Sequence, residues 1–223
     1  MGRGQFQSVT EFSHFSAKTG HVAYCGSLDI PKPWSSIDLH RGRFRPNQPL
    51  AMRHNVGGPI RDVVITGWAV PNVVSQAFVD ALKSAGATGW SLFPVTLYDK
   101  NGRGVSGFHG FQVLGECGPI DWRRSQVVPV TLPGGVFPRF KGMYFVDGTW
   151  DGSDIFGPTD KGFTLMTDRA ASALRRSKIS NMDLEAIEDV VTDIWPGDMQ
   201  PGWKHLWGKT WESLSPADMR PST

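Results

Sequence analysis

Three aspartates that stand close together are the densest group of side chains in this sequence that could take part in chemistry. Asp147, Asp151 and Asp154 are interspersed with Gly148 and Gly152. Clustered carboxylates can bind Ca²⁺, but the spacing here differs from that of an EF-hand loop, and the glutamate that completes such a loop is missing. Aspartate and glycine are also residues that turns favour. We therefore interpret these residues as parts of a turn-rich loop.

Histidine and cysteine are the other side chains that could bind a metal or act as nucleophiles. The six histidines form no HExxH motif and no close pair with metal-ligand spacing. Cys25 and Cys117 lack CxxC spacing, and two thiols alone do not complete a four-ligand zinc site. We interpret both as buried, inert thiols, with a disulfide as the alternative. The sequence therefore predicts no metal and no cofactor.

Motifs for nucleotide binding or acyl transfer are missing as well. The chain has no GxSxG elbow, no P-loop and no GxGxxG that follows a strand. The segment Gly102-Arg103-Gly104 lacks the lysine and the helix that follow a phosphate-binding loop. We therefore expect a protein that is not an enzyme, and an enzyme of an unrecognised type remains the alternative.

Composition and charge describe an ordinary globular protein. Of its 223 residues 39% are hydrophobic and 20% charged, and the formal net charge is +2. This balance argues against nucleic-acid binding through phosphate neutralisation and against an acidic mimic of DNA. The one basic cluster, at 40–45, favours a solvated loop over an anion or nucleic-acid patch. No apolar run approaches the roughly 20 residues that span a bilayer, and no secretory signal is visible, so we expect cytoplasmic residence and no membrane partner.

The pattern of apolar residues predicts a strand over 62–70 and a strand-helix-strand unit over 73–95. Ser75 is a credible N-cap, because its hydroxyl can accept from a backbone N–H of the first turn. Gly86 and Gly89 supply permissive backbone at and after the helix end. The apolar face of the helix follows the i, i+3, i+4, i+7 spacing: Phe78, Ala81, Leu82 and Ala85.

A second unit of this kind is predicted over 165–187, which begins 92 positions after residue 73. Thr167 is its expected N-cap. Asn181 stands where the first unit has Gly89, and asparagine is the best substitute for glycine where φ is positive. Beyond Asn181 the pattern fits both a strand and a helix, and we expect a short strand and then a helix from about Glu185. Chance similarity of two amphipathic segments is the alternative to a true repeat.

These patterns together predict an α+β fold with mixed or mainly antiparallel sheets and two repeated strand-helix-strand-like units. We divide the chain into an irregular N-terminal segment packed on the core (1–60), an α+β domain that contains the repeat (61–195), and a tryptophan-rich, helical C-terminal segment (196–223). In the last segment Trp203, Trp207 and Trp211 stand at i, i+4 and i+8. We expect these tryptophans to dock on the core, with a partner-facing aromatic stripe as the alternative.

One phrase of the sequence resembles a known family. It runs from Trp150 through Phe156 (WDGSDIF), continues past Thr167 to residues 179–181, and is related to residues 74–95. These residues, with the segment GPIDW between them, resemble a family of bacterial immunity proteins of polymorphic toxin systems that is named for a myxobacterial member. The resemblance covers roughly residues 60–190. Some relatives carry paired CxxCG motifs near the N-terminus, and because this chain has none, no zinc-ribbon module is expected.

The resemblance implies a protein that binds and neutralises a cognate toxin, delivered by a contact-dependent or a type VI secretion system. It supplies no catalytic residues. Because loops carry recognition, we expect Trp150, Asp151 and Asp154 to contact the toxin, with Trp203 and Trp207 as the alternative contact residues. A regulatory binding module unrelated to toxins is a further interpretation, and the sequence leaves the oligomeric state open.

Overall fold

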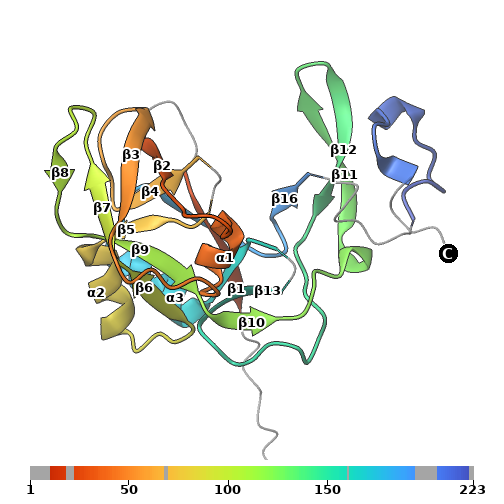
Figure 1. The fold of residues 1–223 in the computed structure, drawn as a ribbon. Helices are drawn as coiled ribbons and strands as arrows, with labels where there is room; N and C mark the ends of the chain where they lie inside the picture. Colours follow the sequence, from red (N-terminus) through yellow and green to blue (C-terminus); the bar gives the residue numbers. More distant parts are fainter. Residues whose placement is uncertain (1–10, 19–22, 68–69, 160, 194–204, 221–223) are drawn as a thin grey trace, which may run out of the picture.

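The computed structural model describes residues 11–18, 23–67, 70–159, 161–193 and 205–220. Within this part the chain is mixed α+β, with many short strands and few helices (Figure 1). The predicted fold class, an α+β protein with mixed sheets, is confirmed. Among the described residues, no helix has the length and apolar content that a membrane crossing requires.

The largest sheet has eight strands in the order β6-β9-β5-β4-β2-β3-β7-β8. Most neighbours are antiparallel, but β2 pairs with β4 and β3 with β7 in parallel. The bounds of the strands are Cys25–Leu28 (β2), Leu50–Val56 (β3), Val63–Thr66 (β4), Val73–Ser75 (β5), Trp90–Phe93 (β6), Val95–Tyr98 (β7), Gly104–Val105 (β8) and Phe108–Val113 (β9).

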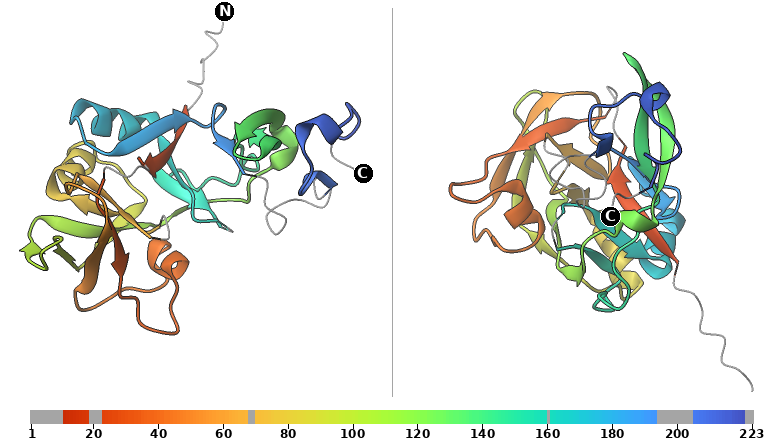
Figure 2. Two further views of the ribbon diagram at one scale, coloured as in Figure 1. Left: turned by 90° about the horizontal axis from the view of Figure 1, so that it is seen from above. Right: turned by 90° about the vertical axis from the view of Figure 1, so that its right-hand side faces the viewer.

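A second sheet has five strands in the order β10-β13-β14-β1-β15, and a third has three in the order β11-β12-β16. In the third sheet a long hairpin, β11–β12, projects beyond the two larger sheets (Figures 1 and 2). The bounds of these strands are Phe12–Ala17 (β1), Gly115–Cys117 (β10), Gln126–Leu132 (β11), Gly135–Lys141 (β12), Ile155–Pro158 (β13), Thr164–Thr167 (β14), Met182–Ala186 (β15) and Val191–Thr192 (β16).

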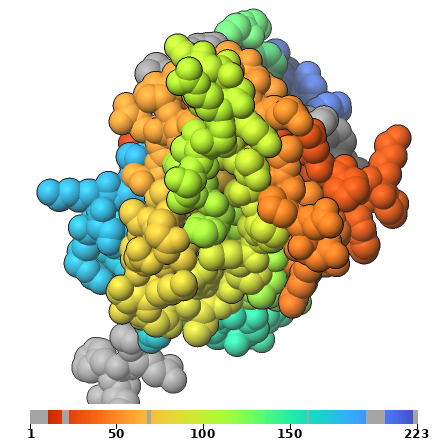
Figure 3. Space-filling view, turned by 60° about the vertical axis from the view of Figure 1, so that its left-hand side comes forward, coloured from red at the N-terminus to blue at the C-terminus, as the bar shows by residue number. Residues whose placement is uncertain are grey.

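Two nine-residue helices, α2 and α3, lie side by side against these sheets, and both reach one face of the molecule (Figure 3). The Ser75 hydroxyl accepts from the Phe78 amide at 3.3 Å, so the predicted N-cap of α2 is confirmed. Thr167 is the N-cap residue of α3, but its hydroxyl makes no capping hydrogen bond. The helical bounds are Ser36–His40 (α1), Gln76–Ser84 (α2), Asp168–Arg176 (α3), Trp122–Arg124 (η1) and Trp211–Ser213 (η3).

The segments β4-β5-α2-β6 and β13-β14-α3-β15 follow the same order of elements. In the first, Val63 of β4 stands opposite Val74 of β5, and in the second Ile155 of β13 stands opposite Met166 of β14. Each residue of the second pair is 92 positions after its counterpart in the first. The turn after each helix also matches, because Gly89 and Asn181 both have positive φ, at 84° and 60°. The predicted left-handed conformation of Asn181 is confirmed.

Each of the two larger sheets contains one strand from a distant part of the chain. β1, near the start of the chain, lies between β14 and β15, where Phe15 stands opposite Leu184. β9, which follows β6, β7 and β8, lies between β5 and β6, where Phe111 stands opposite Leu92. β1 and β9 therefore each lie between two strands that are not their direct neighbours in the sequence.

The main core lies between the two larger sheets and the helices α2 and α3. The ring of Phe78, on α2, packs at 5.2 Å on Phe111 of β9 and at 5.8 Å on Phe15 of β1. Phe78, Leu82 and Leu174 are fully buried in the same cluster. The apolar face that the sequence predicts for the first helix is thus the face that closes this core.

Three expectations about the ends of the domain are wrong for the described residues. The segment 1–60 is not irregular, because it contains β1, β2, α1 and β3. No helix begins at Glu185, because the strand β15 continues to Ala186. The side chains of Ile187 and Val190 are buried, but the segment that carries them is a turn and not a helix. In the C-terminal segment the described residues form no α-helix: they contain only 3-10 helix, at His205 and Leu206 and in the short turn η3. Gly208, with φ of 72°, breaks the expected helical face between Trp207 and Trp211.

Candidate functional site

Asp154, one of the predicted contact residues, is a buried structural carboxylate. It accepts from the Thr88 amide at 3.0 Å, the Thr88 hydroxyl at 3.2 Å and the Thr167 hydroxyl at 2.8 Å. Arg169 lies 3.6 Å away and pairs with it at the surface. Only 6% of the surface of Asp154 is exposed. Its hydrogen bonds to Thr167 and Thr88 join the start of α3 to the turn after α2.

Asp151 and Trp150 also stabilise their own loop. The Asp151 carboxylate accepts from the amides of Glu116 and Ser153, at 2.8 and 2.9 Å, and so ties the loop to β10. The Trp150 indole donates to the Ser153 carbonyl at 2.9 Å, and its ring packs edge-on against Phe12 at 5.2 Å. The fold brings the three predicted residues into one loop, and their side chains are committed to that loop and to the core beneath it.

A cleft of about 320 Å³ opens beside this loop. Apolar and aromatic side chains form its inner wall, and charged side chains stand around it. The lining residues are Phe12, Tyr144, Phe145, Ile187, Glu11, Arg124, Asp147 and Glu188. We call this the acidic cleft, because three of its four charged residues are carboxylates.

A second cavity, of about 340 Å³, lies between the β11–β12 hairpin and the C-terminal segment. Its apolar residues come from both: Leu132, Pro133, Phe137, Pro138, Leu206 and Trp207. Leu206 is buried, whereas Trp207 keeps 52% of its surface exposed. We call this the hairpin groove. Of the alternative contact residues, Trp207 lines this groove, and Trp203 lies outside the described residues.

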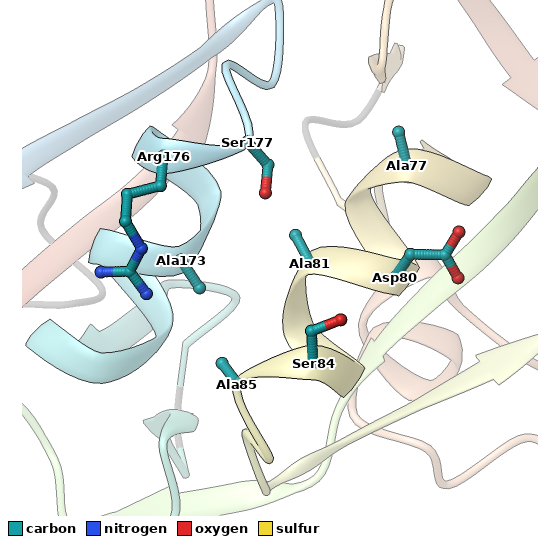
Figure 4. Close-up of a pocket in the computed structure, with 8 residues that line it drawn as sticks. All are labelled: Ala77, Asp80, Ala81, Ser84, Ala85, Ala173, Arg176 and Ser177. Atoms are coloured by element: carbon teal, nitrogen blue, oxygen red, sulfur yellow. The ribbon is translucent and has the colours of Figure 1, made fainter.

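A third cavity, of about 470 Å³, lies between α2 and α3. Figure 4 shows Ala81 of α2 and Ala173 of α3 pointing toward the space between the two helices. Small side chains at these two positions let the helices approach closely, and the polar side chains of Asp80, Ser84 and Arg176 stand around the opening. This arrangement explains the packing of the two helices.

His40 and the two cysteines, which could do acid–base or thiol chemistry, are buried or partly buried. His40 is fully buried, and burial, with a smaller contribution from the neighbouring Arg41, lowers its pKa to about 3, so the ring is neutral at pH 7. No disulfide joins Cys25 and Cys117; Cys117 is buried as expected, and Cys25 is partly buried. Among the described residues, no three His, Cys, Asp or Glu side chains are arranged to hold a metal ion.

The residues of the acidic cleft were not found from the sequence. They come from the start of β1, from η1, from the segment after β12 and from the turn after β15. The spacing of residues in the sequence does not indicate that these four parts meet. The pairing of β1 with β15, which sets Ser13 opposite Ala186, is what brings Phe12 next to Ile187. The sequence does indicate that Asp62 and Asp154 have matching roles, because Asp62 stands 92 positions before Asp154, which is the spacing of the two predicted units.

No protein-family model matches this chain, and no curated protein is similar enough to match it.

Proposed function

We propose that this protein binds a cognate toxin in the cytoplasm and neutralises it, as immunity proteins of polymorphic toxin systems do. The observation that carries the proposal is the half-exposed indole of Trp207 beside the hairpin groove. Large aromatic side chains next to apolar grooves supply much of the binding energy at protein interfaces. The groove lies between the β11–β12 hairpin and the C-terminal segment, and Figure 2 shows both projecting beyond the two larger sheets.

The segment whose sequence resembles the immunity family supports the same proposal, because its residues maintain the fold that displays the binding surface. Two of its residues are Asp154 and Thr167. The Thr167 hydroxyl donates a hydrogen bond to the Asp154 carboxylate at 2.8 Å, and this bond fixes the start of α3. Residues of this kind maintain a fold, and the function of a fold is set by the surface that it displays. A family that neutralises different toxins would share such scaffold residues and vary the binding surface.

We also propose that β4-β5-α2-β6 and β13-β14-α3-β15 are two copies of one unit, and that β9 and β1 are exchanged between the two sheets. The matching registers of the two segments support this proposal. The parts that differ then stand out: β3, β7 and β8 extend one sheet, whereas the β11–β12 hairpin with β16 accompanies the other. We assign recognition of the toxin to the β11–β12 hairpin, because packing against α2 and α3 does not constrain it.

Growth of a bacterial host tests the proposal. The product of each gene adjacent to this one would be expressed alone and together with this chain. We expect one of the products to arrest growth and co-expression of this chain to restore it. A control with the chain carrying a stop codon separates protection by the protein from an effect of the second plasmid. If neither product arrests growth, or if the arrest persists with the chain present, the proposed function is wrong.

A further inference from the structure

The acidic cleft has an apolar wall of the size that one side chain of a partner fills. The ring of Phe12 packs edge-on against Phe145 at 5.3 Å, and both rings line the cleft. Phe145 and Ile187 are nearly buried, so the wall is held rigidly by the core beneath it. A wall of this kind accepts the aliphatic stem of a long side chain, because such a stem buries apolar surface while its polar end stays in contact with water.

The charged residues around the cleft leave negative charge unbalanced. Asp147 is paired with Arg124, since the Arg124 Nη1 lies 2.9 Å from the Asp147 Oδ1. In the described part of the chain neither Glu11 nor Glu188 has a cationic partner. Glu11 and Glu188 therefore remain as two carboxylates beside an apolar wall, and a carboxylate in that position favours a cation.

The strand next to the cleft adds to this negative field. Burial raises the pKa of Glu185, on β15, and the charges of Asp183 and Asp189 raise it further. Lys141 acts in the opposite direction on this pKa, and its Nζ already lies 3.0 Å from the Asp189 carboxylate. The acids of β15 and of the turn after it therefore outnumber their partners, although the whole chain carries a net charge of +2.

The cleft already contains one example of the contact that it favours. The Arg124 guanidinium lies over the ring of Tyr144, with 4.7 Å between Cζ and the ring centroid, while it pairs with Asp147. A planar cation on an aromatic face beside a carboxylate is a stable arrangement, because the ring and the carboxylate both attract it. A second guanidinium would find the same two kinds of group at the other side of the cleft, where Phe12 stands with Glu11 and Glu188.

We propose that the acidic cleft binds an arginine side chain of the protein partner, with its stem against Phe12 and Ile187 and its guanidinium between Glu11 and Glu188. The source of this side chain is the toxin, and that part of the inference rests on the proposed function. The cleft is separate from the hairpin groove in its lining residues, so that each surface can be tested alone.

The test uses the full chain labelled with ¹⁵N and the peptide acetyl-Gly-Arg-Gly-amide as the probe. A single charged side chain on an aromatic wall gives a Kd on the order of 1–10 mM, which amide chemical shifts can measure. We expect saturable shifts at Phe12, Tyr144 and Glu188. The matched peptide with citrulline, which has nearly the same shape and no charge, should bind at least about tenfold more weakly, and the lysine peptide should fall between the two.

Two variants of the chain complete the test. E11Q with E188Q removes both unpaired charges with little change in shape, and it should weaken the arginine peptide at least about fivefold. E212Q, which removes an exposed acid from η3, should leave the affinity unchanged. Equal shifts with the arginine and citrulline peptides, or shifts spread over the whole surface, would overturn the proposed site.

The outcome for the cleft is distinguishable from that for the proposed function, because the peptide experiment uses no toxin. If the cleft binds the peptide but E11Q/E188Q protects growth as well as the unchanged chain does, the toxin is not the source of the arginine. If the peptide fails to bind while growth is restored, the protein neutralises a toxin through another surface and the cleft is not part of it.

Discussion

Asp62, which precedes β4, and Asp154, which precedes β13, make matching hydrogen bonds in the segments β4-β5-α2-β6 and β13-β14-α3-β15, which we call the two halves. Each accepts from the hydroxyl at the start of the helix that follows it: Asp62 from Ser75 at 2.7 Å, and Asp154 from Thr167 at 2.8 Å. Each also holds the turn of the opposite half, since Asp62 accepts from the Ser180 amide at 2.9 Å and Asp154 from the Thr88 amide at 3.0 Å. The two halves are thus fastened to each other by reciprocal hydrogen bonds.

We expect replacement of either aspartate to destabilise the whole fold. D62N and D154N each keep the shape and lose the charge, and each should lower the free energy of unfolding by about 1.5–3 kcal/mol, the range for hydrogen bonds to charged groups. D80N, on the exposed face of α2, should change it by less than about 0.5 kcal/mol. Urea unfolding measures all three. A loss at only one of the two aspartates would contradict the equivalence.

A comparison of two glycines tests the contact between the halves at the level of the backbone. Gly86 and Gly89 both have positive φ, but a Cβ at Gly86 meets nothing within 4 Å, whereas a Cβ at Gly89 would lie 2.1 Å from the Ile155 carbonyl oxygen. G86A should cost about 1 kcal/mol, from strain in φ alone. G89A should cost at least about 2 kcal/mol more, because the two halves must separate locally. Equal losses in thermal unfolding would show that the close approach is absent.

The two turns show how far the sequence could predict the structure. Asn181 in place of Gly89 correctly indicated positive φ, because few residues tolerate that conformation. The Asn181 side chain also donates to the Val63 carbonyl at 2.7 Å, a contact 118 residues away that spacing alone does not indicate. The backbone conformation of these turns could therefore be predicted from the sequence, whereas their contacts with distant residues could not.

The same limit applies to the candidate site. Asp154 is predicted as a contact residue because it stands in the loop before the second unit, and this position suits a recognition residue as well as a buried carboxylate. Its burial depends on Thr88, which approaches from the other half of the fold. Trp207, an alternative contact residue, is half-exposed as such a residue must be, but the helix that its spacing suggested is broken at Gly208, which has positive φ.

Acidification should destabilise the protein through His40. Burial lowers the pKa of His40 from 6.5 to about 3, so the unfolded chain takes up a proton in this window and the folded chain does not. Stability is then complete above about pH 6.5 and falls as the pH drops toward 3, by up to about 1.4 kcal/mol per pH unit. The free energy of unfolding in urea between pH 7 and 4 measures this slope.

Two variants assign the slope to its source. H40L should reduce the slope by about half between pH 6.5 and 4, whatever its effect on stability at pH 7, because it removes one of two groups that are protonated mainly on unfolding. The other is His14, whose pKa burial lowers to about 4, so it too is protonated mainly on unfolding in this window. H109Q changes an exposed histidine that contacts Gln76 and should leave the slope as it is. A slope that stays unchanged in H40L would mean that His40 is not the group responsible.

Trp207 should be the residue whose loss weakens toxin binding most. W207A removes a half-exposed indole at the hairpin groove, and truncation of such a residue at an interface costs about 2 kcal/mol or more, which is about thirtyfold in Kd. W34A is the matched control, because Trp34 is also exposed, at 42%, and it stacks on Phe44 near α1, away from the groove. Similar losses in both variants would remove the hairpin groove from the binding surface.

We propose that this protein neutralises a toxin by forming a complex with it, and titration calorimetry with the purified product of the adjacent gene that arrests growth measures that complex. We predict saturable binding with a Kd below about 1 µM, weakened about thirtyfold in W207A and unchanged in W34A. The absence of binding between the unchanged chain and every product that arrests growth would contradict the claim.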